Sequence, residues 1–134
     1  SHRSYMDFLI VSYLFFQFEL PLPHIAAGND FLAMSLVNWF LRHSGAFFMR
    51  RSFKGDQLYR AVFLSYLQGI LRAGSPLEFF MEGTRSRSGK SLTPRLGVLS
   101  MLVDLFVHDD SLQDLLLCPI TINYERFIEE DSHV

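Results

Sequence analysis

The sequence contains a single cysteine, Cys118, among 134 residues. A disulfide within the chain and a zinc site built from several cysteines are therefore both excluded. An excess of one charge is also missing, because 12 Lys and Arg residues are balanced by 14 Asp and Glu, a formal net charge of −2. The chain as a whole is thus not a polycation of the kind that binds nucleic acid.

Long apolar runs are missing as well. The longest, residues 8–16, is interrupted by Ser12 and is too short to cross a bilayer. No basic stretch is followed by an apolar core and a small-residue cleavage site, so no secretory signal peptide is visible. Ser1 is not an initiator methionine. We therefore expect residues 1–134 to be a single domain excerpted from a longer chain, with targeting signals outside it.

Apolar and aromatic residues are abundant. Hydrophobic residues make up 49% of the chain, and 14 residues are phenylalanine. The mean hydropathy is +0.18. These values exclude an intrinsically disordered chain, which needs low hydrophobicity and high net charge. The phenylalanines suit an aromatic core or a surface that meets something apolar.

Helical and extended stretches alternate along the chain. We expect helices over 5–16, from Asn29 or Asp30 to about 43, from Asp56 to Gly74, and from Thr93-Pro94 to about 107, and strands over 24–27, 46–49, 77–81 and 116–124. In the third helix, apolar residues recur at the spacing of one helical face: Phe63, Tyr66, Leu67, Ile70 and Leu71. The alternation predicts an α/β fold with a mainly parallel sheet flanked by helices.

Three polar clusters, residues 2–7, 50–54 and 82–90, lie directly after predicted strands or beside a helix start. Ligands of parallel sheets bind at the carboxyl ends of the strands. Arg85 and Arg87, two apart in an extended loop, can point their guanidinium groups to one side and bind phosphate oxygens. The alternative is a solvated basic loop.

His2 and Asp7 form a possible catalytic pair. Residues five apart on an ideal helix are about 140° apart, so the two side chains can meet only if His2 lies in a loop before the helix. A carboxylate on one imidazole nitrogen would leave the other nitrogen as a general base. Alternatively, Asp7 is a first-turn helix charge and His2 belongs to a frayed end.

Other motifs are weak or missing. Residues 83–91 nearly match the phosphate-binding loop G-x-x-x-x-G-K-[ST], but five residues separate the glycines and the next helix is expected at Thr93-Pro94. No G-x-S-x-G elbow and no H-E-x-x-H zinc motif occurs. Cys118 is expected in the core of an apolar strand rather than as a nucleophile.

Four segments, in order along nearly the whole chain, resemble the signature blocks of the glycerol-3-phosphate/dihydroxyacetone phosphate acyltransferase family. His2-Arg-Ser-Tyr-Met-Asp7 is similar to the H-x₄-D block. Residues 45–51 resemble the second block, whose final arginine matches Arg51, and residues 80–87 resemble the third, built on E-G-T-R-S. Residues 118–122 resemble the fourth, built around a proline that matches Pro119.

This resemblance implies roles for particular residues. His2 would be the general base and Asp7 would orient it. Substrate-binding positions of the family match a further set of residues: Arg51, Glu82, Gly83, Arg85, Arg87 and Pro119. The implied reaction moves an acyl group directly from acyl-CoA, as co-substrate, to a phosphorylated three-carbon acceptor. No metal or bound organic cofactor is implied.

Residues 24–30, 52–57 and 91–94 are most similar to the dihydroxyacetone phosphate, or ether-lipid, branch. That branch implies dihydroxyacetone phosphate as the acceptor, contact with a membrane surface and a peroxisomal location; a mitochondrial or endoplasmic reticulum membrane is the alternative. Glycerol 3-phosphate is the alternative acceptor. A nucleotide-binding P-loop protein and a non-catalytic phospholipid-binding module are the other function classes.

Overall fold

The computed structural model describes residues 4, 6–29, 35–53, 55–86 and 88–124 of the chain. Its elements, in chain order, are α1 (Met6–Gln17), β1 (His24–Gly28), α2 (Ser35–His43), β2 (Ala46–Met49), α3 (Gln57–Arg72), β3 (Leu77–Glu78) and α4 (Gly97–His108). Helices and strands alternate, which confirms the predicted α/β class. Within the described residues, no helix is both long and apolar enough to span a membrane.

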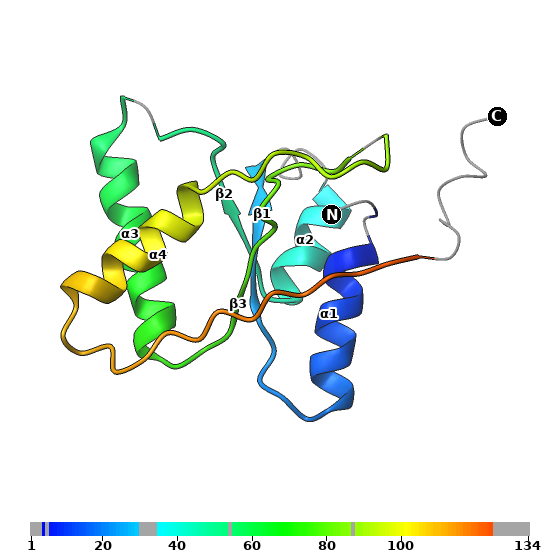
Figure 1. Cartoon of the computed structure of the whole chain (residues 1–134), viewed down its shortest axis with the longest axis horizontal. Coiled ribbons are helices and arrows are strands. Elements are labelled where there is room, and N and C mark those ends of the chain that lie inside the picture. The colour runs from blue at the N-terminus through cyan, green and yellow to red at the C-terminus, as the bar shows by residue number, and fades with distance from the viewer. Residues whose placement is uncertain (1–3, 5, 30–34, 54, 87, 125–134) are drawn as a thin grey trace.

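The three strands form a parallel sheet in the order β2-β1-β3. Ile25 of the central strand pairs with Ala46 on one side and with Glu78 on the other. Because the strands are parallel, all three end at one edge, which we call the carboxyl edge. The segments that follow β2 and β3 therefore leave the sheet at the same end (Figure 1).

Helices cover both faces of the sheet, with α3 and α4 on one side and α1 and α2 on the other (Figure 1). On the first side, Phe63 and Leu67 of α3 pack with Met101 and Leu102 of α4 in a buried cluster that receives Leu77 and Phe79. On the second side, the buried cluster is Ile25, Leu41 and Ala46. Since side chains alternate along a strand, β2 contributes to both clusters, with Phe47 and Met49 on the first side and Ala46 and Phe48 on the second.

Helix α3 follows its sequence pattern closely. The Asp56 carboxylate caps it by accepting a hydrogen bond of 2.8 Å from the Tyr59 N–H. Of the predicted face, Phe63, Leu67 and Ile70 are buried. Tyr66 is 44% exposed, and its ring lies edge-on to Phe47 at 5.1 Å between centroids. Burial of each large apolar side chain contributes about 1.5–3 kcal/mol to folding.

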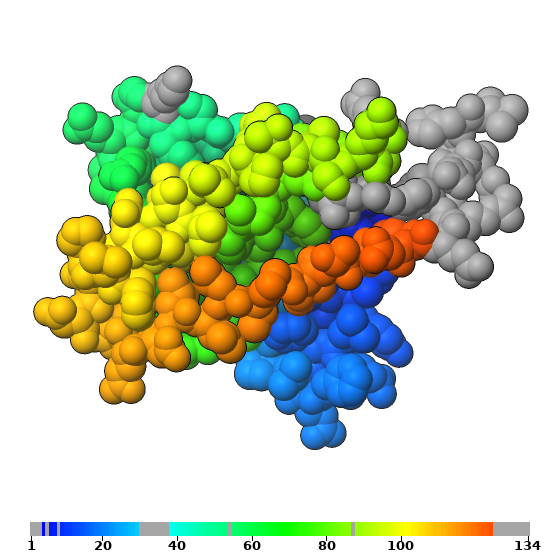
Figure 2. All heavy atoms as spheres, in the orientation of Figure 1, coloured from blue at the N-terminus to red at the C-terminus, as the bar shows by residue number. Residues whose placement is uncertain are grey.

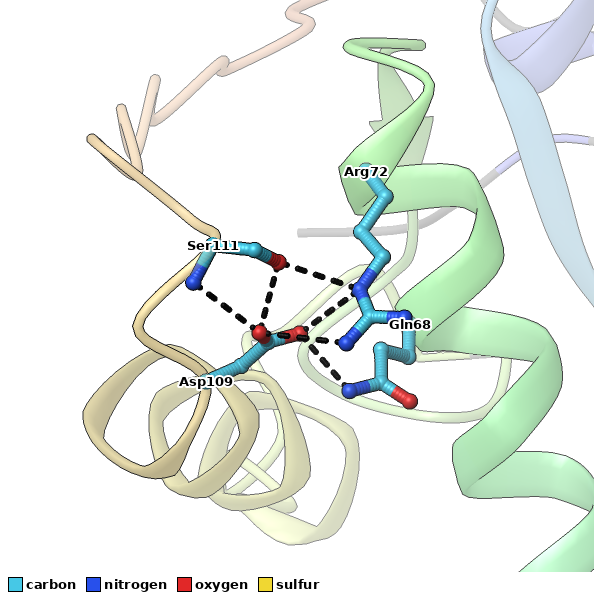
Figure 3. A network of polar contacts seen from close by, with 4 residues as sticks. All are labelled: Gln68, Arg72, Asp109 and Ser111. Carbon is cyan, nitrogen blue, oxygen red and sulfur yellow. Dashed lines mark hydrogen bonds and ion pairs between the residues drawn. The ribbon is translucent and has the colours of Figure 1, made fainter.

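A polar network joins the end of α4 to α3 (Figure 3). The buried Asp109 carboxylate accepts hydrogen bonds from Gln68 at 2.7 Å and from Arg72 at 2.9 and 3.2 Å. It also accepts from the Ser111 hydroxyl at 2.6 Å. These bonds lower the pKa of Asp109 below its usual range, the bond from Arg72 most of all. The network therefore holds α3 and the end of α4 together by polar contacts, in addition to the apolar packing between the two helices.

The third strand is shorter than predicted, two residues instead of residues 77–81. The backbone beyond Glu78 bonds elsewhere: the Phe80 carbonyl accepts from Gly83 N–H at 2.9 Å and the Met81 carbonyl from Arg95 N–H at 2.6 Å. The bond between the Arg95 N–H and the Met81 carbonyl also holds Arg95 against the loop that follows β3. Helix α4 accordingly begins at Gly97, later than the predicted start at Thr93-Pro94, without a side-chain cap.

The predicted strand at 116–124 is wrong. This segment runs extended across the molecule from α4 toward the first turn of α1 (Figure 1), but it is not part of the sheet. Leu116 and Ile120 are 81% and 60% exposed, and Cys118 is exposed rather than in the core. An apolar pattern favours an extended backbone, but a strand also needs a neighbouring strand for its hydrogen bonds.

The helix predicted from Asn29 or Asp30 is confirmed over Ser35–His43. Its predicted start falls partly on residues 30–34, which lie outside the described residues. Gly45 follows the helix with a φ of +86°, the left-handed conformation that favours glycine.

Candidate active site

Asp7 occupies the first turn of α1 and is 1% exposed. Its Oδ2 accepts a hydrogen bond of 3.2 Å from the Ser4 N–H, while the Ser4 hydroxyl accepts one of 3.0 Å from the Met6 N–H. Together the two bonds make a variant of the capping box, in which the Asp7 carboxylate satisfies the Ser4 N–H and the Ser4 hydroxyl satisfies the N–H of Met6. The capping box fixes the Asp7 carboxylate at the start of the helix.

Tyr124 reaches the same carboxylate from the far end of the described chain. Its hydroxyl donates a hydrogen bond of 2.5 Å to Asp7 Oδ1. Asp7 is thus held on both oxygens, by Ser4 on one and by Tyr124 on the other. A carboxylate fixed in this way can orient a neighbouring imidazole.

His2 lies outside the described residues. Helix α1 begins at Met6, after His2 in the sequence. The requirement that His2 precede the helix is therefore compatible with the observed helix start. Its pairing with Asp7 remains a prediction.

The two arginines after β2 differ in their surroundings. Arg50 donates a hydrogen bond of 2.7 Å to the Asp56 carboxylate, and its guanidinium lies 4.4 Å from the centre of the Tyr59 ring. Arg50 therefore supports the start of α3. Arg51 is exposed at the carboxyl edge, where the sequence predicts a phosphate contact.

The loop after β3 carries the other predicted binding residues. Glu82 is 9% exposed, and Gly83 adopts a φ of +63°. A Cβ at Gly83 would lie 3.1 Å from Arg95 Cδ, so both the backbone conformation and the close approach of Arg95 favour glycine. Arg85 is half-buried, and Arg87 lies outside the described residues.

This loop is further closed by the buried Ser86, whose hydroxyl donates a hydrogen bond of 2.5 Å to the Lys90 carbonyl. The structure excludes a P-loop here, because the next helix begins at Gly97 and not at Lys90. Arg51 and the loop after β3 follow strands that end at the same edge. The structure thus brings the two basic segments to one end of the sheet.

Pro119 is exposed and lies on the extended segment 112–124. It is Tyr124 of this segment that contacts Asp7. The placement of Pro119 in a substrate site stays a prediction. Among the described residues, no group of three or more His, Cys, Asp or Glu side chains is placed to hold a metal ion.

A second carboxyl group lies near Asp7. Burial, as the larger cause, and the negative charge of Asp7 together raise the pKa of Glu78 to about 7. Both Glu78 carboxyl oxygens are buried, and neither has a hydrogen-bond partner among the described residues. The site therefore combines a fixed carboxylate, a carboxyl that resists ionisation and nearby basic loops.

The acyltransferase family model matches residues 1–123. The chain belongs to the acyltransferase family. It is 52% identical over 135 residues to dihydroxyacetone phosphate acyltransferase of Homo sapiens. The aligned region includes 100% of this chain and 20% of the human protein. Over 134 residues, it is 50% identical to the Mus musculus enzyme of the same name, an alignment that includes 99% of this chain and 20% of the mouse protein.

Over 133 residues, the chain is 48% identical to glycerol-3-phosphate acyltransferase of Pseudomonas aeruginosa (strain LESB58), with 99% of this chain and 16% of that protein covered. This acyltransferase chain therefore spans a fifth or less of the length of the curated relatives it matches.

Three site residues of this acyltransferase were missed by the sequence analysis. Ser4 has a local signal, since S-x-x-D before an apolar run is the pattern of a capping box. Tyr124 has no such signal, because 117 positions separate it from Asp7. Glu78 is one acidic residue in an apolar stretch, and only the sheet shows that it is on the α1 side.

Proposed function

We propose that this acyltransferase moves a fatty acyl group from acyl-CoA to the primary hydroxyl of dihydroxyacetone phosphate. The observation that carries the proposed chemistry is the buried Asp7 carboxylate, held on both oxygens and placed directly after the segment that contains His2. A fixed carboxylate of this kind sets the tautomer of an imidazole and stabilises its protonated form.

In this proposal, His2 takes the proton of the acceptor hydroxyl while the hydroxyl oxygen attacks the thioester carbonyl carbon. The carbon–sulfur bond then breaks, and the proton passes from His2 to the departing thiolate of CoA. General-base catalysis of this type contributes on the order of 10²–10⁴ in rate. The acyl group passes directly between the two substrates, without a covalent acyl-enzyme.

The acceptor phosphate is bound by Arg85 and Arg87, with Arg51 as a further contact. Support comes from the chain topology, because the segments after β2 and β3 leave the same edge of the sheet. Guanidinium groups bind phosphate oxygens through paired hydrogen bonds. Holding the phosphate places the hydroxyl near His2 and makes its attack effectively intramolecular.

Dihydroxyacetone phosphate is proposed over glycerol 3-phosphate because the identity to the human enzyme named for the former is 52%, against 48% for the bacterial enzyme named for the latter. The two acceptors differ only at the middle carbon. The test is kcat/KM for both acceptors with one saturating long-chain acyl-CoA, using the full-length protein in vesicles. A clear preference for glycerol 3-phosphate would assign the alternative acceptor.

The proposal includes a membrane surface. Four large side chains at the end of α1 and in the loop after it are at least half exposed: Phe16, Phe18, Leu20 and Leu22. This part of the chain protrudes from the molecule (Figure 2). Exposed aromatic and aliphatic side chains of this kind suit the interfacial region of a bilayer. With the ether-lipid acceptor, we propose a peroxisomal membrane, which localisation of the tagged full-length protein tests.

Replacement of the general base tests the reaction itself. His2→Ala in the full-length protein should lower turnover by about 10²-fold or more while acyl-CoA still binds. His108→Ala is the matched control, because His108 is exposed in the last turn of α4. Undiminished turnover of His2→Ala would contradict the proposal. Binding of phospholipid by a wild-type protein that transfers no acyl group would favour the non-catalytic phospholipid-binding module.

A further inference from the structure

Glu78 stands out because it places a carboxyl group on an otherwise apolar part of the sheet. It pairs with Ile25 across the parallel ladder, and paired residues point to the same face. Its neighbours Leu77 and Phe79 pack on the opposite side, against the cluster of α3 and α4. The Glu78 side chain therefore lies on the face that α1 and α2 cover.

Two carboxyl groups thus share one buried region. Asp7 is fixed by hydrogen bonds from Ser4 and Tyr124, whereas neither Glu78 oxygen has a partner among the described residues. A buried carboxyl without donors is strongly disfavoured in its charged form, and a nearby negative charge disfavours it further. This explains why the pKa of Glu78 is raised to about 7, mainly by burial and additionally by Asp7.

Building on the proposed acyl transfer, we propose that Glu78 is a positioning residue that must be protonated for the reaction. In its neutral form, Glu78 leaves Asp7 as the carboxylate that orients His2. When Glu78 ionises, a second negative charge enters the same buried region. That charge repels the Asp7 carboxylate, which the bonds from Ser4 and Tyr124 hold in place, and so disturbs the orientation of His2 for accepting the hydroxyl proton.

Among the described residues, α2 on this face carries two basic groups: Arg42, whose guanidinium lies 5.6 Å from the centre of the Phe48 ring, and His43, whose Nδ1 lies 2.7 Å from the Trp39 carbonyl oxygen. Asp7 is on α1, and the Tyr124 hydroxyl is bonded to it. His24 of β1 pairs with Leu77, whose side chain lies on the α3 side, so strand alternation directs His24 away from Glu78. Glu82 follows in the loop after the same strand. Asp7 is the charge that acts on Glu78.

The decisive experiment is the pH profile of kcat/KM for acyl transfer by the full-length protein. In the wild type, kcat/KM should fall about tenfold per pH unit above about pH 7, as Glu78 loses its proton. Glu78→Gln mimics the neutral carboxyl. It should match the wild type within about twofold below pH 6 and lack this alkaline fall. Glu78→Asp keeps a titratable group and should restore a fall.

Glu19→Gln is the matched control, because Glu19 is an exposed glutamate after α1, and it should reproduce the wild-type profile. Coincident profiles of Glu78→Gln and the wild type would overturn the proposal. So would a folded Glu78→Gln protein that is inactive at every pH, because the ionised carboxyl would then be required.

An infrared titration of the wild-type protein needs no variant. We expect a buried protonated carboxyl band that disappears between about pH 6 and 8; its absence would overturn the proposal even if Glu78→Gln did not fold. A wild-type protein without acyltransferase activity would instead overturn the proposed function and, with it, the role of Glu78 in that reaction. The infrared band would still report the protonation of Glu78 independently.

Discussion

The Tyr124 hydroxyl donates a hydrogen bond of 2.5 Å to Oδ1 of Asp7, although 117 positions separate the two residues in the sequence. The bond ties the extended segment 112–124 to the first turn of α1. It also occupies one oxygen of the carboxylate that we assign to the orientation of His2. The phenol is thereby part of the candidate site through Asp7.

Removal of this hydroxyl tests that relationship. Tyr124→Phe should lower kcat about tenfold or more and leave both KM values nearly unchanged, since a hydrogen bond to a charged group contributes about 1.5–3 kcal/mol. Steady-state kinetics of the full-length protein measure this effect. Tyr13→Phe, at a tyrosine that is 62% exposed, is the control. Unchanged kcat in Tyr124→Phe would show that the Tyr124 bond is not needed to position Asp7.

The capping box of α1 predicts a loss of stability. Ser4→Ala removes the hydroxyl that accepts from the Met6 N–H, and loss of such a cap costs about 1 kcal/mol. Denaturant unfolding of wild type and variant measures the difference. Ser65→Ala, at an exposed position inside α3, should show no loss, because alanine is the better helix former. Equal stability of Ser4→Ala and the wild type would contradict the assigned cap.

Glu78 predicts how stability depends on pH. Its pKa in the folded protein is raised from 4.5 to about 7, so the folded state binds more protons than the unfolded state between these values. The stability contributed by Glu78 is therefore complete at low pH and falls as the pH rises through this range, by roughly 3 kcal/mol in total.

Glu78→Gln should remove that dependence. Relative to the wild type, the variant should gain stability progressively as the pH rises toward about 7 and keep that gain above it. Chemical denaturation at a series of pH values gives the difference curve. The corresponding curve for Glu19→Gln should be flat. A flat curve for Glu78→Gln would mean that Glu78 ionises normally in the folded protein.

Asp109 predicts a pH dependence of opposite sign. Hydrogen bonds, chiefly from Arg72, hold its pKa below the usual value, so its stabilising effect is present at neutral pH and is lost as the pH falls below about 4. Asp109→Asn should unfold at a lower temperature than the wild type at pH 7. The difference between the two unfolding temperatures should become smaller in acid. The exposed neighbour provides the control, Asp110→Asn, which should cause a much smaller change. A difference in unfolding temperature that stays constant with pH would exclude the charge of Asp109 as the cause of that difference.

Arg85→Lys tests phosphate recognition. Lysine keeps the charge but not the two-pronged geometry, so the KM for the phosphorylated acceptor should rise about tenfold while the KM for acyl-CoA changes little. The same substitution at Arg87 tests the second predicted contact. Arg60→Lys, at an exposed position of α3, should leave both values unchanged. Equal weakening of both substrates by Arg85→Lys would indicate a structural role instead.

Local sequence determined the helices and much of the sheet. The cap at Asp56 and the apolar face of Phe63, Leu67 and Ile70 were predicted correctly, because a helix forms its hydrogen bonds within one segment. The strands β1 and β2 and the parallel sheet were predicted for a related reason. Short apolar runs between helices can be joined in only a few ways.

Only the tertiary structure decided where contacts distant in sequence are made. The turn after β3, which is bonded to Arg95, shortened a predicted strand, and segment 112–124 stayed outside the sheet. The same holds within the site. The motif identified Asp7 from the sequence alone, but its contact with Tyr124 and its proximity to Glu78 depend on packing between separate segments. Side-chain type and spacing specify local hydrogen bonds, whereas burial and the field of a neighbouring charge exist only once the chain has folded.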